Sequence, residues 1–293
     1  MEQTKSSRSS RSKNLQGPES LSNSAFLFNT RDVSALKARF CSTTSADDVI
    51  PDKTVDIPQE YVLPDIDRAV LNRADLDISR LSTNDYVRAF IHILHKIVKH
   101  AKLDIGTGDS LTDSLVADLI YNVLAFSQWP LKVELHPTMK LFIGHVILPA
   151  KAEFAISNKY YYLLFVEDKY LTNVRPDFDY GEPQILAEML ACGEENLQRA
   201  CKTYTMNMFV VRVISTYVTF YRATIHKEYW DELGNGCPRR QSLTIFRWPG
   251  NSSNPFLGFD LADPNGRRTV LESLCKIRQY ILDSLFFTIP LKV

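Results

Sequence analysis

The chain has 293 residues, 45% of them hydrophobic, and its 34 basic side chains balance 34 acidic ones. This length and apolar content are enough for one large domain or two small ones with a sizeable core. The net charge is zero, so the chain is not basic overall as many nucleic-acid-binding proteins are. Any surface that attracts nucleic acid must therefore be local. No run of about 18 apolar residues occurs, which excludes a membrane-spanning helix and a membrane partner.

The first 16 residues are polar, Ser-rich and basic, and they lack the apolar segment of a secretory signal. Five cysteines form no Cys-x-x-Cys pair and are odd in number, which is typical of reduced thiols. We therefore expect an intracellular protein, nuclear or cytoplasmic. The basic cluster Arg8, Arg11 and Lys13 suits either a nuclear-import or nucleic-acid tail or a merely solvated chain end.

Residues 1–64 are rich in Ser, Thr, Asp and Pro and contain one apolar island at residues 25–28. This composition predicts a mostly disordered tail with at most local docking. The folded part is expected from near Ile66, with a helical lead-in over residues 65–104. Within it, apolar residues at three- and four-residue spacing predict an amphipathic helix over residues 83–102.

A second helix is predicted over residues 110–126 and carries two acids, Asp113 and Asp118. Asp113 suits the first helical turn, where a negative charge interacts favourably with the helix dipole. Asp118 lies further inside the helix and is the better candidate for a site. A structural role remains open for both.

Residues 152–188 are the most informative stretch of the sequence. A short apolar run that contains Glu153 is followed by a turn and by the run of residues 160–166, which ends in Glu167-Asp168-Lys169. A helix with Pro183 in its first turn follows. A buried strand is not expected to end in three charged residues unless those residues have a function.

Alternation along a strand places Glu167 and Lys169 on one face and Asp168 on the other. A carboxylate beside an ammonium group can hold a divalent cation and orient a water. Glu153 adds a second carboxylate if the hairpin has an odd number of loop residues centred on Tyr160, which would set Glu153 opposite Glu167. We predict that odd loop; a two-residue turn would instead send Glu153 to the other face, and Glu134 competes for the same role.

Glu153, then Glu167-x-Lys169 fourteen residues later, then Gln184 at the start of the next helix resembles the PD-(D/E)XK nuclease-like superfamily. The resemblance covers roughly residues 105–226: a hairpin, acid-x-Lys at the end of its second strand, and a helix that opens with Gln. The segment is also similar to nuclease-like domains of Crinkler-type and related fungal or oomycete proteins. The resemblance implies a restriction-endonuclease-like fold over residues 105–293, in which Gln184 would help fix a water or a phosphate.

The same resemblance implies a nuclease that uses Mg²⁺ or Mn²⁺. Glu153 and Glu167 would bind the ion, with Asp118 as an acid from the preceding helix and the Asp168 carbonyl as a backbone ligand. Lys169 would orient the attacking water and stabilise charge on the phosphate. The partner would be DNA or RNA, and a homodimer is the assembly that would cut both strands.

The remaining sequence predicts strands over residues 209–214, 217–225 and 243–248, and a closing helix after Asp263-Pro264. Phe220-Tyr221-Arg222 suits either a base-stacking platform or, more commonly, a sheet core. The fold class expected is α/β, with a central mixed sheet of about five strands flanked by helices.

Two alternatives stay open. The usual Pro-Asp of the superfamily is Ala152-Glu153 here, which, together with the neutral charge, favours a catalytically inactive protein that binds nucleic acid or a partner protein, as an effector or scaffold. In the second alternative, Glu167-Asp168-Lys169 is only a charged sheet edge that discourages pairing with other chains.

Overall fold

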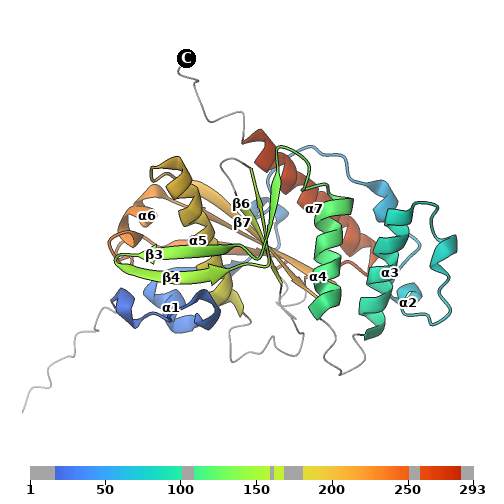
Figure 1. The fold of residues 1–293 in the computed structure, drawn as a ribbon, viewed down its shortest axis with the longest axis horizontal. Helices are drawn as coiled ribbons and strands as arrows, with labels where there is room; N and C mark the ends of the chain where they lie inside the picture. The colour runs from blue at the N-terminus through green and yellow to red at the C-terminus, as the bar shows by residue number, and fades with distance from the viewer. Residues whose placement is uncertain (1–16, 101–108, 159–161, 168–180, 251–257, 285–293) are drawn as a thin grey trace, which may run out of the picture.

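The computed structural model describes residues 17–100, 109–158, 162–167, 181–250 and 258–284. Its centre is a mixed sheet of eight strands in the order β1-β9-β8-β7-β6-β5-β2, with β10 paired to β8 (Figure 1). The α/β class with a mixed sheet flanked by helices is confirmed; five contiguous strands, β2 and β5 to β8, run inward from one edge, and β9, β1 and β10 extend the sheet. The bounds are β1 Ala38–Ser42, β2 Lys132–Leu135, β5 Phe154–Ser157, β6 Tyr162–Glu167, β7 Met206–Ile214, β8 Tyr217–Ile225, β9 Leu243–Trp248 and β10 Phe259–Asp260.

Each face of this sheet is covered by its own hydrophobic core, because side chains alternate between the faces along every strand. On β7, Phe209 and Val211 belong to the first core and Met208 and Val210 to the second. The first core packs under α3 (Asp85–His100), α4 (Asp109–Asp118) and α7 (Pro264–Asp283). The second packs under α5 (Glu182–Ala200), α1 (Thr30–Ala35), α6 (Lys227–Leu233) and the hairpin of β3 (Thr138–Ile143) and β4 (Val146–Lys151).

The predicted long helices are confirmed. In α3 the buried residues Val87, Phe90, Ile91, Leu94, Ile97 and Val98 form one stripe at helical spacing. The second predicted helix is divided: α4 ends at Asp118, and one π-helical turn, η6 (Leu119–Val123), continues it. In α7 the side chain of Asp263 caps the helix by accepting from the backbone N–H groups of Asn265 and Gly266.

The interpretation of residues 1–64 as a mostly disordered tail is wrong for residues 17–64. β1 pairs with β9 as an edge strand, and Leu36, Val49 and Tyr61 are buried. The segment also contains α1 and four short helical turns, η1 Pro18–Ser20, η2 Ala25–Leu27, η3 Ala46–Asp48 and η4 Gln59–Tyr61. Two more short elements follow it, α2 Arg68–Leu71 and η5 Ile78–Arg80. These elements are too short to be stable alone, so tertiary contacts stabilise them. No local periodicity of apolar residues predicts them.

The stacking platform is also excluded, because Phe220 and Tyr221 are buried in the sheet at 0% and 1% exposure.

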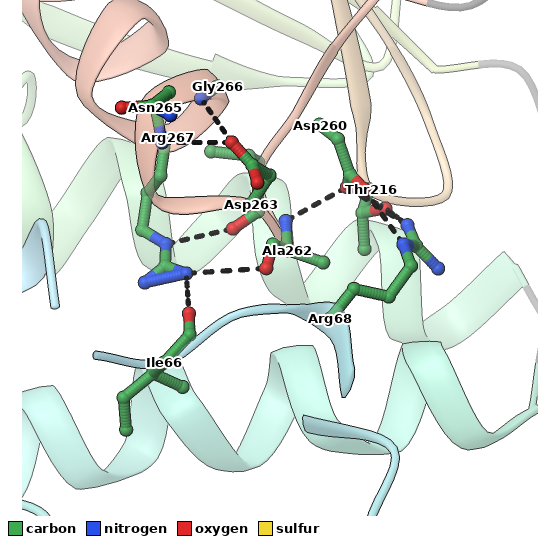
Figure 2. Close-up of polar contacts among 10 residues, drawn as sticks. Ile66, Arg68, Thr216, Asp260, Ala262, Asp263, Asn265, Gly266 and Arg267 are labelled. Carbon is green, nitrogen blue, oxygen red and sulfur yellow. Dashed lines mark hydrogen bonds and ion pairs between the residues drawn. The ribbon is translucent and has the colours of Figure 1, made fainter. Parts of the chain in front are cut away.

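A buried arginine joins the N-terminal segment to the start of α7 (Figure 2). Arg267 has no exposed surface, and its guanidinium donates to the carbonyl oxygens of Leu261 at 2.8 Å, Val62 at 3.0 Å and Ile66 at 2.6 Å. Burial lowers the pKa of Arg267 to about 10. Beside it, Asp260 accepts from Arg68 at 2.8 Å and from the hydroxyl of Thr216 at 2.6 Å. Charged groups thus fix the path of residues 62–68 across one end of the sheet.

Replacing Arg267 by methionine is expected to lower the free energy of unfolding by about 3 kcal/mol, because methionine keeps most of the stem volume but removes the donor that binds the buried carbonyls of Leu261, Val62 and Ile66. Urea unfolding followed by circular dichroism measures the change. Arg268→Met is the matched control, because Arg268 is exposed and the change should stay within about 0.5 kcal/mol. Equal stability of the two variants would contradict the anchoring role of Arg267.

Candidate active site

The strand directions bring several predicted and unpredicted polar residues to one end of the sheet. β1, β2, β6, β7 and β9 run in the same direction, and β5 and β8 run against them. In open α/β sheets, ligands bind beyond the carboxyl ends of such strands. Glu167 is the last residue of β6, and Glu153 immediately precedes β5, so both lie at this end.

The β5–β6 hairpin decides which residues lie beside each other. The pairs run from Ser157↔Tyr162 to Phe154↔Phe165, so residues 158–161 form a connection of four residues. The predicted odd loop is therefore wrong, and the register carried one step further sets Glu153 beside Val166. Because side chains alternate along a strand, residue 153 and residue 167 then belong to opposite faces of the sheet, and the predicted shared face is wrong as well. The apolar alternation of the strands, with Phe154 in the first core and Ala155 in the second, fixes this register.

Glu153 is held by a histidine that the sequence analysis did not select. The Nδ1 atom of His136 lies 2.7 Å from Oε2 of Glu153, and the backbone N–H of His136 donates to the Glu153 carbonyl at 2.8 Å. His136 follows β2 directly and has a positive φ of 48°, an uncommon conformation for a residue with a side chain. The only available signal was a histidine at the end of a short β-type run; its contact with Glu153 arises from the pairing of β2 with β5.

On the other side of β6, Val166 pairs with Arg212 of β7. Arg212 is 2% exposed and lies on the face of the second core, as does Arg247 of β9. The guanidinium of Arg247 donates to Oε1 of Glu182 at 2.6 Å, and also donates to the hydroxyl of Ser42 at the end of β1. The hydroxyl of Tyr221 donates to the same Glu182 oxygen at 3.4 Å. Four strands and the first residue of α5 therefore contribute to one buried charged group.

Burial dominates the electrostatics of this group. It raises the pKa of Glu182 even though the charges of Arg247 and Arg212 act to lower it. Burial, reinforced by the Glu182 charge, also raises the pKa of Tyr221 well above its ordinary value. The phenol therefore stays protonated at neutral pH and can donate a hydrogen bond.

Gln184, on the first turn of α5, already has a partner one turn along. Its side-chain amide donates to Oε1 of Glu188 at 2.7 Å, and Glu188 is 1% exposed. Gln184 is therefore at the predicted end of the sheet, with its amide directed by a buried carboxylate.

Asp118 is a buried carboxylate on the opposite face. It is 6% exposed and accepts from the side-chain amide of Asn122 at 2.6 Å, while its Oδ2 has no hydrogen-bond partner among the described residues. Burial raises the pKa of Asp118, and the bond from Asn122 offsets only part of that effect. The π-helical turn that begins at Leu119 follows it directly, and such turns are frequent at functional sites.

Asp168 and Lys169 lie outside the described residues, and of Glu167 only the backbone is described. Within the described ranges, no three His, Cys, Asp or Glu side chains come together as a metal site. The contact with His136 is made by Oε2 of Glu153.

No protein-family model matches the chain, and no curated protein matches it either. Among the described residues, every helix is too short or too polar to reach across a lipid bilayer.

Asp118→Asn is expected to stabilise the protein at neutral pH. Because the folded-state pKa of Asp118 is raised, the folded state binds the proton more tightly, and the free energy of unfolding falls as the pH rises through the interval between the unfolded and folded values. The stabilisation by Asn should therefore be near zero at about pH 3.5 and should increase as the pH rises to 7. Urea unfolding across this pH range measures it.

Asp113→Asn, on the same helix, is the matched control and should change stability by less than about 0.5 kcal/mol. A destabilised Asp118→Asn variant at pH 7 would show instead that the carboxylate has a stabilising partner.

Proposed function

We propose that the protein hydrolyses phosphodiester bonds of DNA or RNA at the carboxyl end of β6, with Mg²⁺ or Mn²⁺ as the cofactor. The order of elements supports this proposal. The β5–β6 hairpin ends at Glu167, α5 opens with Gln184 in its first turn, and β7 then lies parallel to β6. This is the order of hairpin, acidic strand end and Gln-bearing helix on which the resemblance to the PD-(D/E)XK nucleases rests.

The observation that carries the proposal is the row across β5, β6 and β7. The register sets Glu153 on one side of Val166 and Arg212 on the other, one residue before Glu167. A carboxylate on one side and a buried guanidinium on the other suit a phosphodiester with a bound cation, because carboxylates bind Mg²⁺ and the fixed positive charge of Arg212 favours an anion nearby. Phosphoryl chemistry of this kind depends chiefly on positioning and on charge.

Each residue of the candidate site has a proposed role. Strand alternation sets position 167 and Asp118 on the side of the first core and Glu153 on the side of the second, so these acids would have to hold the ion around the strand end, with the Asp168 carbonyl as a further ligand. The ion, when bound, would activate water and stabilise charge on the phosphate. Lys169 would orient the water. His136 would fix the orientation of the Glu153 carboxylate by holding Oε2, as the hydrogen-bond partners of metal-binding side chains commonly do. Gln184 would assist through its directed amide.

The proposal is tested with purified protein, Mg²⁺ or Mn²⁺, and labelled single-stranded DNA, duplex DNA and RNA. Glu153→Gln and Lys169→Ala should each reduce the cleavage rate at least about 100-fold, because each removes a group that acts on the reacting phosphate or water. Lys151→Ala is the control, since Lys151 is exposed on β4, and should cleave at the normal rate.

Equal cleavage by the normal protein and Lys169→Ala would remove the proposed mechanism. Calorimetry that finds no binding of Mg²⁺ or Mn²⁺, together with retained affinity for nucleic acid, would instead favour the catalytically inactive effector or scaffold. Gel filtration with light scattering decides whether the active form is the proposed homodimer, and imaging of tagged protein decides between nucleus and cytoplasm.

A further inference from the structure

A large cleft lies at the opposite end of the sheet from the candidate active site. It is formed by α1, by α6 and by the segment of residues 234–240, and its volume is about 1340 Å³. Lys37 precedes the start of β1, and Arg239 and Arg240 precede the start of β9, so the cleft lies beyond the amino ends of these parallel strands. In Figure 1, α1 and α6 lie on the same side of the sheet as α5, whereas α3 and α7 lie on the other side. We call this the α1–α6 cleft.

The α1–α6 cleft carries an excess of positive charge. Arg31, Lys37, Arg239 and Arg240 line it, and all four are exposed. Among the described residues, none of the four forms an ion pair with a carboxylate; Lys37 donates instead to the carbonyl oxygen of Arg239. Four cationic groups around one concave surface attract an anion even though the whole chain is neutral.

The two carboxylates that line the cleft are already engaged. Asp231 pairs with Lys227 and accepts from the hydroxyl of Thr203 at 2.9 Å. Glu232 accepts the backbone N–H groups of residues 239, 240 and 241 at 2.7, 2.9 and 3.2 Å. These bonds, with a smaller contribution from the charge of Arg240, lower the pKa of Glu232 and fix the backbone that carries both arginines. Within the part of the chain that the structure describes, neither arginine side chain has an ion pair, so both guanidinium groups can bind a ligand.

The shape and lining indicate the class of anion. The volume exceeds the roughly 300–1,000 Å³ of ordinary small-molecule pockets, which favours a chain-like ligand. No Phe, Tyr or Trp lines the cleft in the described part of the protein, so bases have no surface to stack on. Arginine pairs strongly with phosphate oxygens. We propose that the α1–α6 cleft binds the phosphodiester backbone of single-stranded nucleic acid, with little preference among bases.

This binding does not require the hydrolysis proposed above, and it can be measured under conditions where hydrolysis does not occur. Fluorescence anisotropy of a labelled oligothymidylate in EDTA reports binding where metal-dependent cleavage cannot occur. Each phosphate contact on a single strand contributes about 0.7 to the slope of log affinity against log salt, so four contacts predict a slope of about −3. An oligoadenylate of equal length should bind with nearly the same slope.

The decisive variant is the double substitution Arg239→Ala and Arg240→Ala, which keeps the backbone contacts to Glu232. Loss of two contacts should reduce the slope by about 1.4 and weaken binding about 25-fold at 0.1 M salt. The matched control is Lys96→Ala with Arg268→Ala, which removes the same charge from exposed positions on α3 and α7. The control should bind like the normal protein.

An unchanged slope in the Arg239/Arg240 variant, or an equal loss in the control, would overturn the assignment. Absence of binding by the normal protein at low salt would also overturn it. The basic residues of the first 16 positions are present in every variant, so they cannot produce a difference between them. Normal cleavage with lost binding, or the reverse, separates this inference from the proposed catalytic function.

Discussion

The parallel pairing of β6 with β7 is the constraint on which the candidate site depends. Because β6 also pairs antiparallel with β5, one strand end is bordered by Glu153 on one side and by Arg212 on the other. The helix α5, which lies between β6 and β7 in the sequence, brings Glu182 and Gln184 to the same end of the sheet. Any other strand order would separate these residues, so the chemistry of this end follows from topology rather than from any one motif.

Buried charges in this fold are mostly compensated. Arg267 binds backbone carbonyls, and Glu182 binds Arg247. Such groups are costly to bury unless hydrogen bonds replace the lost water. Asp118 departs from this pattern, because one of its buried oxygens has no partner among the described residues. Natural proteins tolerate local costs of this kind mainly where function requires them, which is why Asp118 stays in the proposed site.

Zero net charge conceals an uneven distribution. The acids Glu153 and Glu182 gather at the carboxyl end of the parallel strands together with buried arginines, whereas the α1–α6 cleft at the amino end presents exposed cations. The first arrangement suits chemistry on a phosphate and the second suits holding a phosphate backbone. These two regions lie at opposite ends of the sheet. Nucleic acid bound in the α1–α6 cleft would therefore make contacts separate from those at the carboxyl end of β6.

The sequence by itself determined the α/β class and the long helices, because the apolar period of α3 is local and leaves a stripe readable along one segment. It also located the strand that ends at Glu167. Tertiary structure decided the rest. The hairpin register followed from packing on both faces of the sheet. Residues 17–64 adopt a defined structure because they contact distant strands. His136, Arg212 and Arg247 reached the candidate site only through strand pairing. Such pairings join residues far apart in the chain, and no local pattern encodes which strands become neighbours.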